Sequence, residues 1–136
     1  MTIGIAAAVR TSMMTDIRDA IDAGAGAGRL QIYSGTRPAT GAAPGAAVLL
    51  ADIPLNDPCG TVASGVLTFG GMPREATAAA GGTAAWARFV DSTGAFVADA
   101  SVTVSGGGGI VQLASLTIAN GQTVRVTSGQ LTEGNP

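Results

Sequence analysis

The spacing of apolar residues changes once along this chain, at the glycine-rich run of residues 23–28. Before the run, over residues 5–22, an apolar residue recurs at every fourth position, which is typical of an amphipathic helix. After it, apolar and polar residues alternate in short segments, which is the pattern of strands. We therefore expect one N-terminal helix followed by a β domain.

The predicted helix carries one apolar stripe, which is a candidate protein contact. The stripe consists of Ile5, Val9, Met13, Met14, Ile17 and Ile21. Two placements are open for it, because an amphipathic helix either covers its own sheet or buries its stripe against a neighbouring molecule. Gly24, Gly26 and Gly28 are predicted to end the helix and to act as a hinge, since glycine readily adopts left-handed backbone conformations. Residues 1–28 then form an arm of the same domain as residues 29–136.

Seven short strands are expected in residues 29–136. They lie at residues 29–33, 49–55, 62–69, 83–90, 95–104, 110–118 and 122–131. Short strands separated by turns, with no helices between them, favour an antiparallel β-sandwich of the jelly-roll kind. The stretch at residues 70–82 contains no clear alternation and is predicted to be mobile.

Two hairpins are expected within this set of strands. Asp91, Ser92, Thr93 and Gly94 have the composition of a turn between residues 83–90 and 95–104. Asn120-Gly121 is the strongest short hairpin signal that a sequence offers. It predicts pairing between residues 110–118 and 122–131, with Val124 and Val126 facing inward.

Trp86 and Arg88 share one face of a predicted strand and are further candidate contact residues. Trp86 has two possible roles. It either fills the core, or it lies on the surface as an interface anchor, because tryptophan and arginine are frequent hot-spot residues. The alternation alone does not decide which face of the strand is buried.

The residues that most catalytic sites require are missing. The chain has no histidine, which removes the usual general base and most transition-metal sites. The single cysteine, Cys59, has no neighbouring arginine in the sequence to activate it and is predicted to be a small buried or half-buried residue. The Gly24-x-Gly26-x-Gly28 run follows a helix, the reverse of a phosphate-binding loop. We expect no enzyme activity, no cofactor and no metal.

The charge pattern limits the possible partners. The formal net charge is -2, and the seven basic residues are all arginines spread along the chain. Such a chain lacks the basic patch that nucleic acids or anionic membranes require. No run of about 18 apolar residues exists to span a membrane. We expect no nucleic-acid or membrane partner. The N-terminal residues show no export signal, which predicts synthesis in a cytoplasm.

Four segments together carry a resemblance to a known group of proteins. They are AIDAGAGAGRLQIYSGTRPA at 20–39, LNDPCGTVASGVLTF at 55–69, AAWARFVDSTGAFVADASV at 84–102 and TIANGQTVRVTSGQLTEGN at 117–135. The chain resembles small virion structural proteins of tailed bacteriophages and prophages, and in size and β-sandwich character it is similar to capsid cement, or head decoration, proteins. The resemblance implies a homodimer or homotrimer that is made in the host bacterial cytoplasm and lies on the outer capsid surface of the virion. There it would bind the major capsid protein and tie neighbouring capsid subunits together.

Two other functions are compatible with the same sequence. One is a different virion component, such as a head-tail connector or a tail protein. The other is a carbohydrate-binding β-sandwich, in which exposed Trp86 and Tyr33 would stack on sugar rings.

Overall fold

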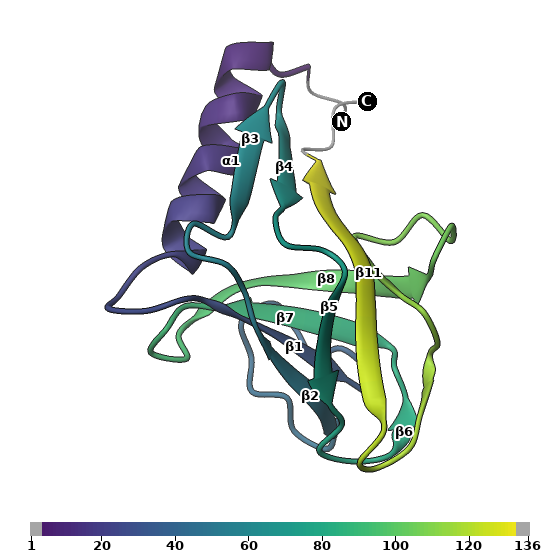
Figure 1. The fold of residues 1–136 in the computed structure, drawn as a ribbon. Coiled ribbons are helices and arrows are strands. Elements are labelled where there is room, and N and C mark those ends of the chain that lie inside the picture. Colours follow the sequence, from purple (N-terminus) through teal and green to yellow (C-terminus); the bar gives the residue numbers. More distant parts are fainter. Residues whose placement is uncertain (1–3, 133–136) are drawn as a thin grey trace.

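The computed structural model describes residues 4–132, and within them it contains one helix and eleven strands (Figure 1). The elements are α1 (Ala7–Ile21), β1 (Arg29–Tyr33), β2 (Leu49–Pro54), β3 (Gly60–Ala63), β4 (Val66–Phe69), β5 (Arg74–Thr77), β6 (Gly82–Thr83), β7 (Trp86–Val90), β8 (Phe96–Val104), β9 (Val111–Leu113), β10 (Thr117–Ile118) and β11 (Thr123–Thr132). Residues 1–3 of the predicted arm and 133–136 of the predicted β domain lie outside the described residues.

The fold is mainly β, as predicted, and is built on one curled sheet. Its strand order is β2-β1-β7-β8-β9-β11-β4-β3, with β5 also pairing with β11, and β6 and β10 form a separate two-stranded sheet. The curl brings the β2 end of the sheet toward the β5 side, where the Ala79 amide donates a hydrogen bond to the Leu50 carbonyl at 2.8 Å. The sandwich and jelly-roll parts of the prediction are not confirmed.

The prediction of a wholly antiparallel sheet is wrong, because β8 and β9 pair in parallel. Residues 105–110 join the two strands and include four glycines, two of which, Gly106 and Gly108, have positive φ angles. A Cβ atom on Gly107 or Gly109 would lie 2.7–2.8 Å from the side chain of Thr103. The glycines therefore let the chain double back tightly against β8, where a parallel pair normally needs a longer crossover.

The first predicted hairpin is confirmed. The second is confirmed in part, since β9 and β11 pair antiparallel but β10, directly before the Asn120-Gly121 turn, does not pair with β11. Strands β7 and β8 pair antiparallel around the turn at residues 91–94. Asn120-Gly121 does form a turn, but β10 before it pairs with β6, while β11 after it pairs with β9 on one side and with β5 and β4 on the other. Both edges of β11 are thus occupied by other strands. Val124 and Val126 face inward, as predicted.

The stretch predicted to be mobile, residues 70–82, instead contains β5 and β6. Strand β5 pairs with β11 over its whole length. Arg74 fixes its start, since Nε donates to the Pro54 carbonyl at 2.8 Å and the guanidinium also bonds Asn56 Oδ1. The small residues of this stretch give a weak alternation, which explains why the sequence pattern missed a short strand.

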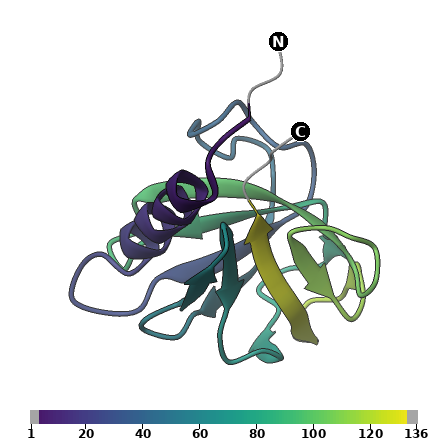
Figure 2. The same ribbon diagram turned by 90° about the horizontal axis from the view of Figure 1, so that it is seen from above.

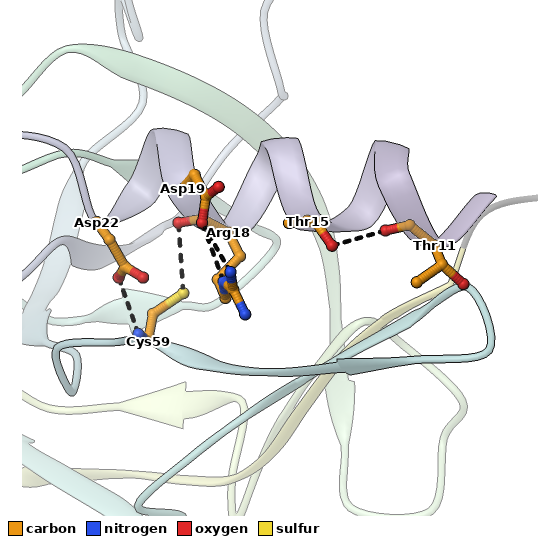
Figure 3. A network of polar contacts seen from close by, with 6 residues as sticks. All are labelled: Thr11, Thr15, Arg18, Asp19, Asp22 and Cys59. Carbon is orange, nitrogen blue, oxygen red and sulfur yellow. Dashed lines mark hydrogen bonds and ion pairs between the residues drawn. The ribbon is translucent and has the colours of Figure 1, made fainter. Parts of the chain in front are cut away.

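The helix folds back on its own sheet, which decides between the two placements left open by the sequence. It packs against β3, β4 and β8, with Met14 and Ile21 buried (Figures 1 and 2). Asp22 Oδ1 accepts a hydrogen bond from the Cys59 amide at 2.8 Å (Figure 3). At the other end of α1, Thr11 Oγ1 accepts one from the Gly65 amide at 2.9 Å. Polar contacts therefore fasten both ends of the helix.

The glycine run after α1 is closely packed. A Cβ atom on Gly28 would lie 2.5 Å from both the carbonyl oxygen and Cγ2 of Ile21. Gly24 has a φ of +96° and lies against the side chain of Ser92, which donates to the Ala23 carbonyl. Only glycine fits the close approach at Gly24 and Gly28, whereas a Cβ on Gly26 would meet no atom closer than 3.9 Å. A hinge motion at these glycines stays a prediction.

Candidate interaction surfaces

The apolar stripe of α1 divides between two faces of the helix. Val9 and Met13 are 51% and 37% exposed, whereas Met14 and Ile21 are buried. The reason lies in the spacing, because a step of four residues overshoots one helical turn by about 40°. Over the length of the stripe the apolar side chains rotate from the outside of the helix toward the sheet. Ile17 is half-buried between these extremes, whereas Ile5, also half-buried, precedes α1 and is not part of the helix, contrary to the prediction.

We call Val9 and Met13 the outer α1 stripe. They lie one turn apart, next to the exposed side chains of Ser12 and Asp16. The structure therefore places only two of the six predicted helix contact residues on an exposed surface.

Trp86 and Arg88 lie on a second face, away from α1 and inside the molecule. Every residue of β7 is buried, because both of its faces are covered. Phe89 belongs to the main hydrophobic core, where its ring stacks on Phe69 at 4.7 Å. The Trp86 ring points to the other face and stacks on Tyr33, with 4.4 Å between ring centroids.

Arg88 organises this second face. Its guanidinium forms two hydrogen bonds to the Asp99 carboxylate, at 2.7 and 3.1 Å, and both side chains are buried. The guanidinium carbon also lies 5.3 Å from the Trp86 ring centroid and 4.9 Å from that of Phe96. The hydrogen bond to Asp99 raises the pKa of Arg88, and burial raises the pKa of Tyr33. We call Tyr33, Trp86, Arg88 and Phe96 the outer aromatic cluster.

The connection between β1 and β2, residues 34–48, covers this cluster, and we call it the cover loop. Arg88 Nη2 donates a hydrogen bond to the Ala42 carbonyl at 2.9 Å, and a Cβ on Gly41 would lie 3.6 Å from the Phe96 ring. Figure 2 shows the cover loop, in blue, on the opposite side of β8 from β4 and β11. Trp86 is therefore 2% exposed, so the expectation of an exposed Trp86 and Tyr33 for stacking on sugars is wrong.

A groove of about 500 Å³ opens between β4, β9 and β11. Its polar lining includes Thr68, Gln112, Ser128 and Gln130, and its lining has no charged side chain. The groove lies where β11 passes from pairing with β5 to pairing with β4. Sequence reasoning missed the groove because it depends on the pairing of β11 with β4, a strand that is distant in the chain. Hydroxyl and amide groups of this kind suit a neutral polar ligand.

Cys59 is a structural residue, as predicted. Its side chain is fully buried below the C-terminal end of α1, and burial together with the neighbouring Asp22 raises the pKa of the thiol to about 12 (Figure 3). The thiolate is the reactive form, so this thiol is inert in the folded chain.

Two further findings concern metal binding and membrane-spanning helices. Within residues 4–132, no three acidic or cysteine side chains gather as a metal site requires. The single helix of this part is too short to cross a membrane.

Comparison of the chain with protein-family models, with curated proteins and with solved structures finds no match.

Proposed function

We propose that this chain is a structural protein of a tailed-bacteriophage virion, and specifically a capsid cement protein that binds the major capsid protein on the outside of the head. The observation that supports this role best is the outer α1 stripe. Two large apolar side chains, Val9 and Met13, lie exposed on a helix that is fastened to the domain at both ends. The resemblance of four sequence segments to small phage virion proteins supports the same role.

The arrangement of the sheet favours contact through α1 over addition of a strand. The terminal strand β3 packs against α1, and the other terminal strand, β2, lies close to β5. Exposed strand edges, which otherwise pair with foreign chains, are thus limited. Burial of apolar surface contributes about 25 cal/mol per Å², so two side chains give weak binding per copy. Repetition over a symmetric lattice, helped by self-association into a dimer or trimer, makes such weak contacts sufficient.

The test replaces the outer α1 stripe with charge. We expect the double substitution Val9→Asp and Met13→Asp to weaken binding to expanded capsids of the encoding phage by at least about tenfold, since charge at a buried apolar contact is strongly unfavourable. Cosedimentation measures the binding. Ser12→Asp on the same exposed part of α1 is the matched control, and circular dichroism confirms the fold of each variant.

Two results would contradict the proposal at different levels. Unchanged binding by the double variant would exclude the outer α1 stripe as the contact. Failure of the intact chain to bind capsids at all would exclude the cement role.

The alternative within the same class is a head-tail connector or a tail protein. Counting copies per purified particle separates the two. Hundreds of copies over the head fit a cement protein, whereas about a dozen at one vertex fit a connector.

The neutral groove favours one function from another class, the binding of carbohydrate. Its hydroxyl and amide lining provides donors and acceptors for sugar hydroxyls, in place of the buried Trp86. Binding to a glycan array that is lost on Gln130→Leu would support this function. A silent array with folded protein would exclude it.

A further inference from the structure

The outer aromatic cluster has one unsatisfied polar group. The indole Nε1 of Trp86 is buried and has no hydrogen-bond partner in the part of the chain that the structure describes. Most buried donors in proteins are paired, so a buried donor of this kind points to an acceptor that is supplied by something else. The Tyr33 hydroxyl, in contrast, donates to Gln31 Oε1 at 3.2 Å, and Arg88 donates to Asp99 and Ala42 through Nε and Nη2.

The cover loop is attached to the cluster weakly. Its own backbone hydrogen bonds are local, from Ala42 to Ala39, from Ala47 to Pro44 and, at its base, from Ser34 to Val48. Residues 35–47 contain no apolar side chain larger than proline, and Val48 at the base of the loop is 44% exposed, so the loop brings little hydrophobic surface to the cluster. Its side-chain hydrogen bond to the cluster is the one from Arg88 to the Ala42 carbonyl. Connections of this length without helix or strand are uncommon in compact domains and are often functional.

We propose that the cover loop is displaceable, and that the outer aromatic cluster beneath it docks an extended segment of a partner protein built from small residues. The cover loop itself shows the chemistry of such a segment. A backbone carbonyl accepts from Arg88, and a glycine without a side chain lies against the Phe96 ring. A partner segment of the same kind can also offer a carbonyl to Trp86 Nε1, which the cover loop leaves unsatisfied.

The residue types of the cluster fit this role. Tryptophan, tyrosine and arginine dominate the energetics of protein interfaces. They are preassembled here, because Tyr33 and Trp86 stack on each other and Asp99 fixes Arg88. A partner would therefore meet ordered side chains once the cover loop has moved, which reduces the entropy lost on binding.

The test uses the cover loop as its own model ligand. Trp86 is the only tryptophan, so its fluorescence reports on this cluster alone. In the full chain, residues 36–46 are replaced by a glycine-serine segment of equal length. We expect the acrylamide quenching constant of Trp86 to rise severalfold and a synthetic peptide of residues 35–47 to reverse the rise in a saturable way. Half-saturation is expected well below millimolar peptide, because the tethered loop is closed at an effective concentration of about a millimolar.

Two controls make the result specific. A peptide of the same composition in scrambled order should not protect Trp86. Phe96→Ala in the replaced background should weaken peptide binding about fivefold, because Phe96 contacts Gly41 and is partly exposed, so that its truncation leaves the fold intact.

Three outcomes would overturn the proposal. The first is an unchanged quenching constant after replacement of the cover loop. The second is equal protection by the native and the scrambled peptide. The third is loss of folding, both in the replaced chain and in a milder variant with four glycines inserted after Gly45, because the cover loop would then be an integral part of the fold.

Discussion

The two faces of β7 carry the same kind of aromatic stack in different surroundings. On the core face, Phe89 stacks on Phe69 with an interplanar angle of 5°, and on the outer face, Trp86 stacks on Tyr33 with an angle of 10°. The core face is enclosed by apolar side chains from the curled sheet and α1. The outer face contains the Arg88 ion pair and is covered by a loop of small residues. The two ring stacks are therefore similarly buried for different reasons. Phe89 lies in an apolar core, whereas Trp86 is covered by a loop that is held by a hydrogen bond from Arg88.

This difference suggests separate roles for the two faces of β7: the core face stabilises the fold, and the outer face is available for contact with a partner. Apolar burial on the core face is a large and non-directional source of stability. The outer face is organised by directional hydrogen bonds, whose net contribution depends on every partner being present. Stability is expected to be concentrated on the core face, and adaptability on the outer face.

The largest effect is expected from truncation on the core face. Phe89→Ala should lower the free energy of unfolding by about 4 kcal/mol, because it removes a fully buried ring and leaves a cavity. Urea denaturation measures the change. Phe96→Ala, at the edge of the outer face, is the matched control and should lower it by less than about 1 kcal/mol. Equal losses would contradict the distinction between the two faces.

The next effect concerns the ion pair of the outer face. Arg88→Met alone should lower the free energy of unfolding by about 3 kcal/mol, since it leaves the Asp99 carboxylate buried without its partner. The double substitution Arg88→Met and Asp99→Leu should recover most of this loss, because both charges are then removed. A double-mutant cycle in denaturant gives the coupling. Additive losses would show that Arg88 and Asp99 act independently.

A smaller effect is expected where the chain leaves α1. Gly28→Ala should lower the free energy of unfolding by about 2 kcal/mol, because its Cβ would overlap the backbone of Ile21. Gly26→Ala should change it by no more than about 0.5 kcal/mol, since a Cβ fits there. Tolerance of both substitutions would favour the free hinge predicted from the sequence.

The smallest effect is a pH dependence from Cys59. Its pKa is about 12 in the folded chain, against an ordinary value of 9.0, so the unfolded chain loses this proton first as pH rises. Stability from this thiol is complete below pH 9.0 and declines from there toward pH 12. At pH 9.5 the loss should be about 0.8 kcal/mol. Denaturation at pH 7.5 and 9.5 measures it, and an identical pH dependence in Cys59→Ala would contradict the assignment.

The sequence predicted what depends on neighbouring residues. The α1 helix, the β7–β8 hairpin and the inward Val124 and Val126 follow from local periodicity and turn composition. The parallel β8–β9 pair and the pairing of β11 with β4 and β5 were missed, because they depend on which distant edges are free. Local pattern carries no such information.

For the candidate surfaces, too, local features were predicted from the sequence and long-range contacts were not. The α1 stripe was visible in the sequence, but its division into inner and outer parts depends on the rotation of the helix against the sheet. The environment of Trp86 was not predictable from the sequence. Its neighbour Arg88 donates a hydrogen bond to the Ala42 carbonyl, and Ala42 lies 46 positions before Arg88 in the chain. A strand with both faces buried shows no alternation that reveals a second covering layer.

Native-state hydrogen exchange of the Trp86 indole N–H, followed by NMR together with the backbone amides of β7, tests most directly whether the outer face is a separable layer. If it is, the indole N–H exchanges through local opening of the cover loop, with a free energy well below that of global unfolding and little dependence on denaturant. The protected β7 amides should exchange only through global unfolding. An indole N–H that exchanges with the same free energy and denaturant dependence as these amides would show that the two faces form one cooperative core.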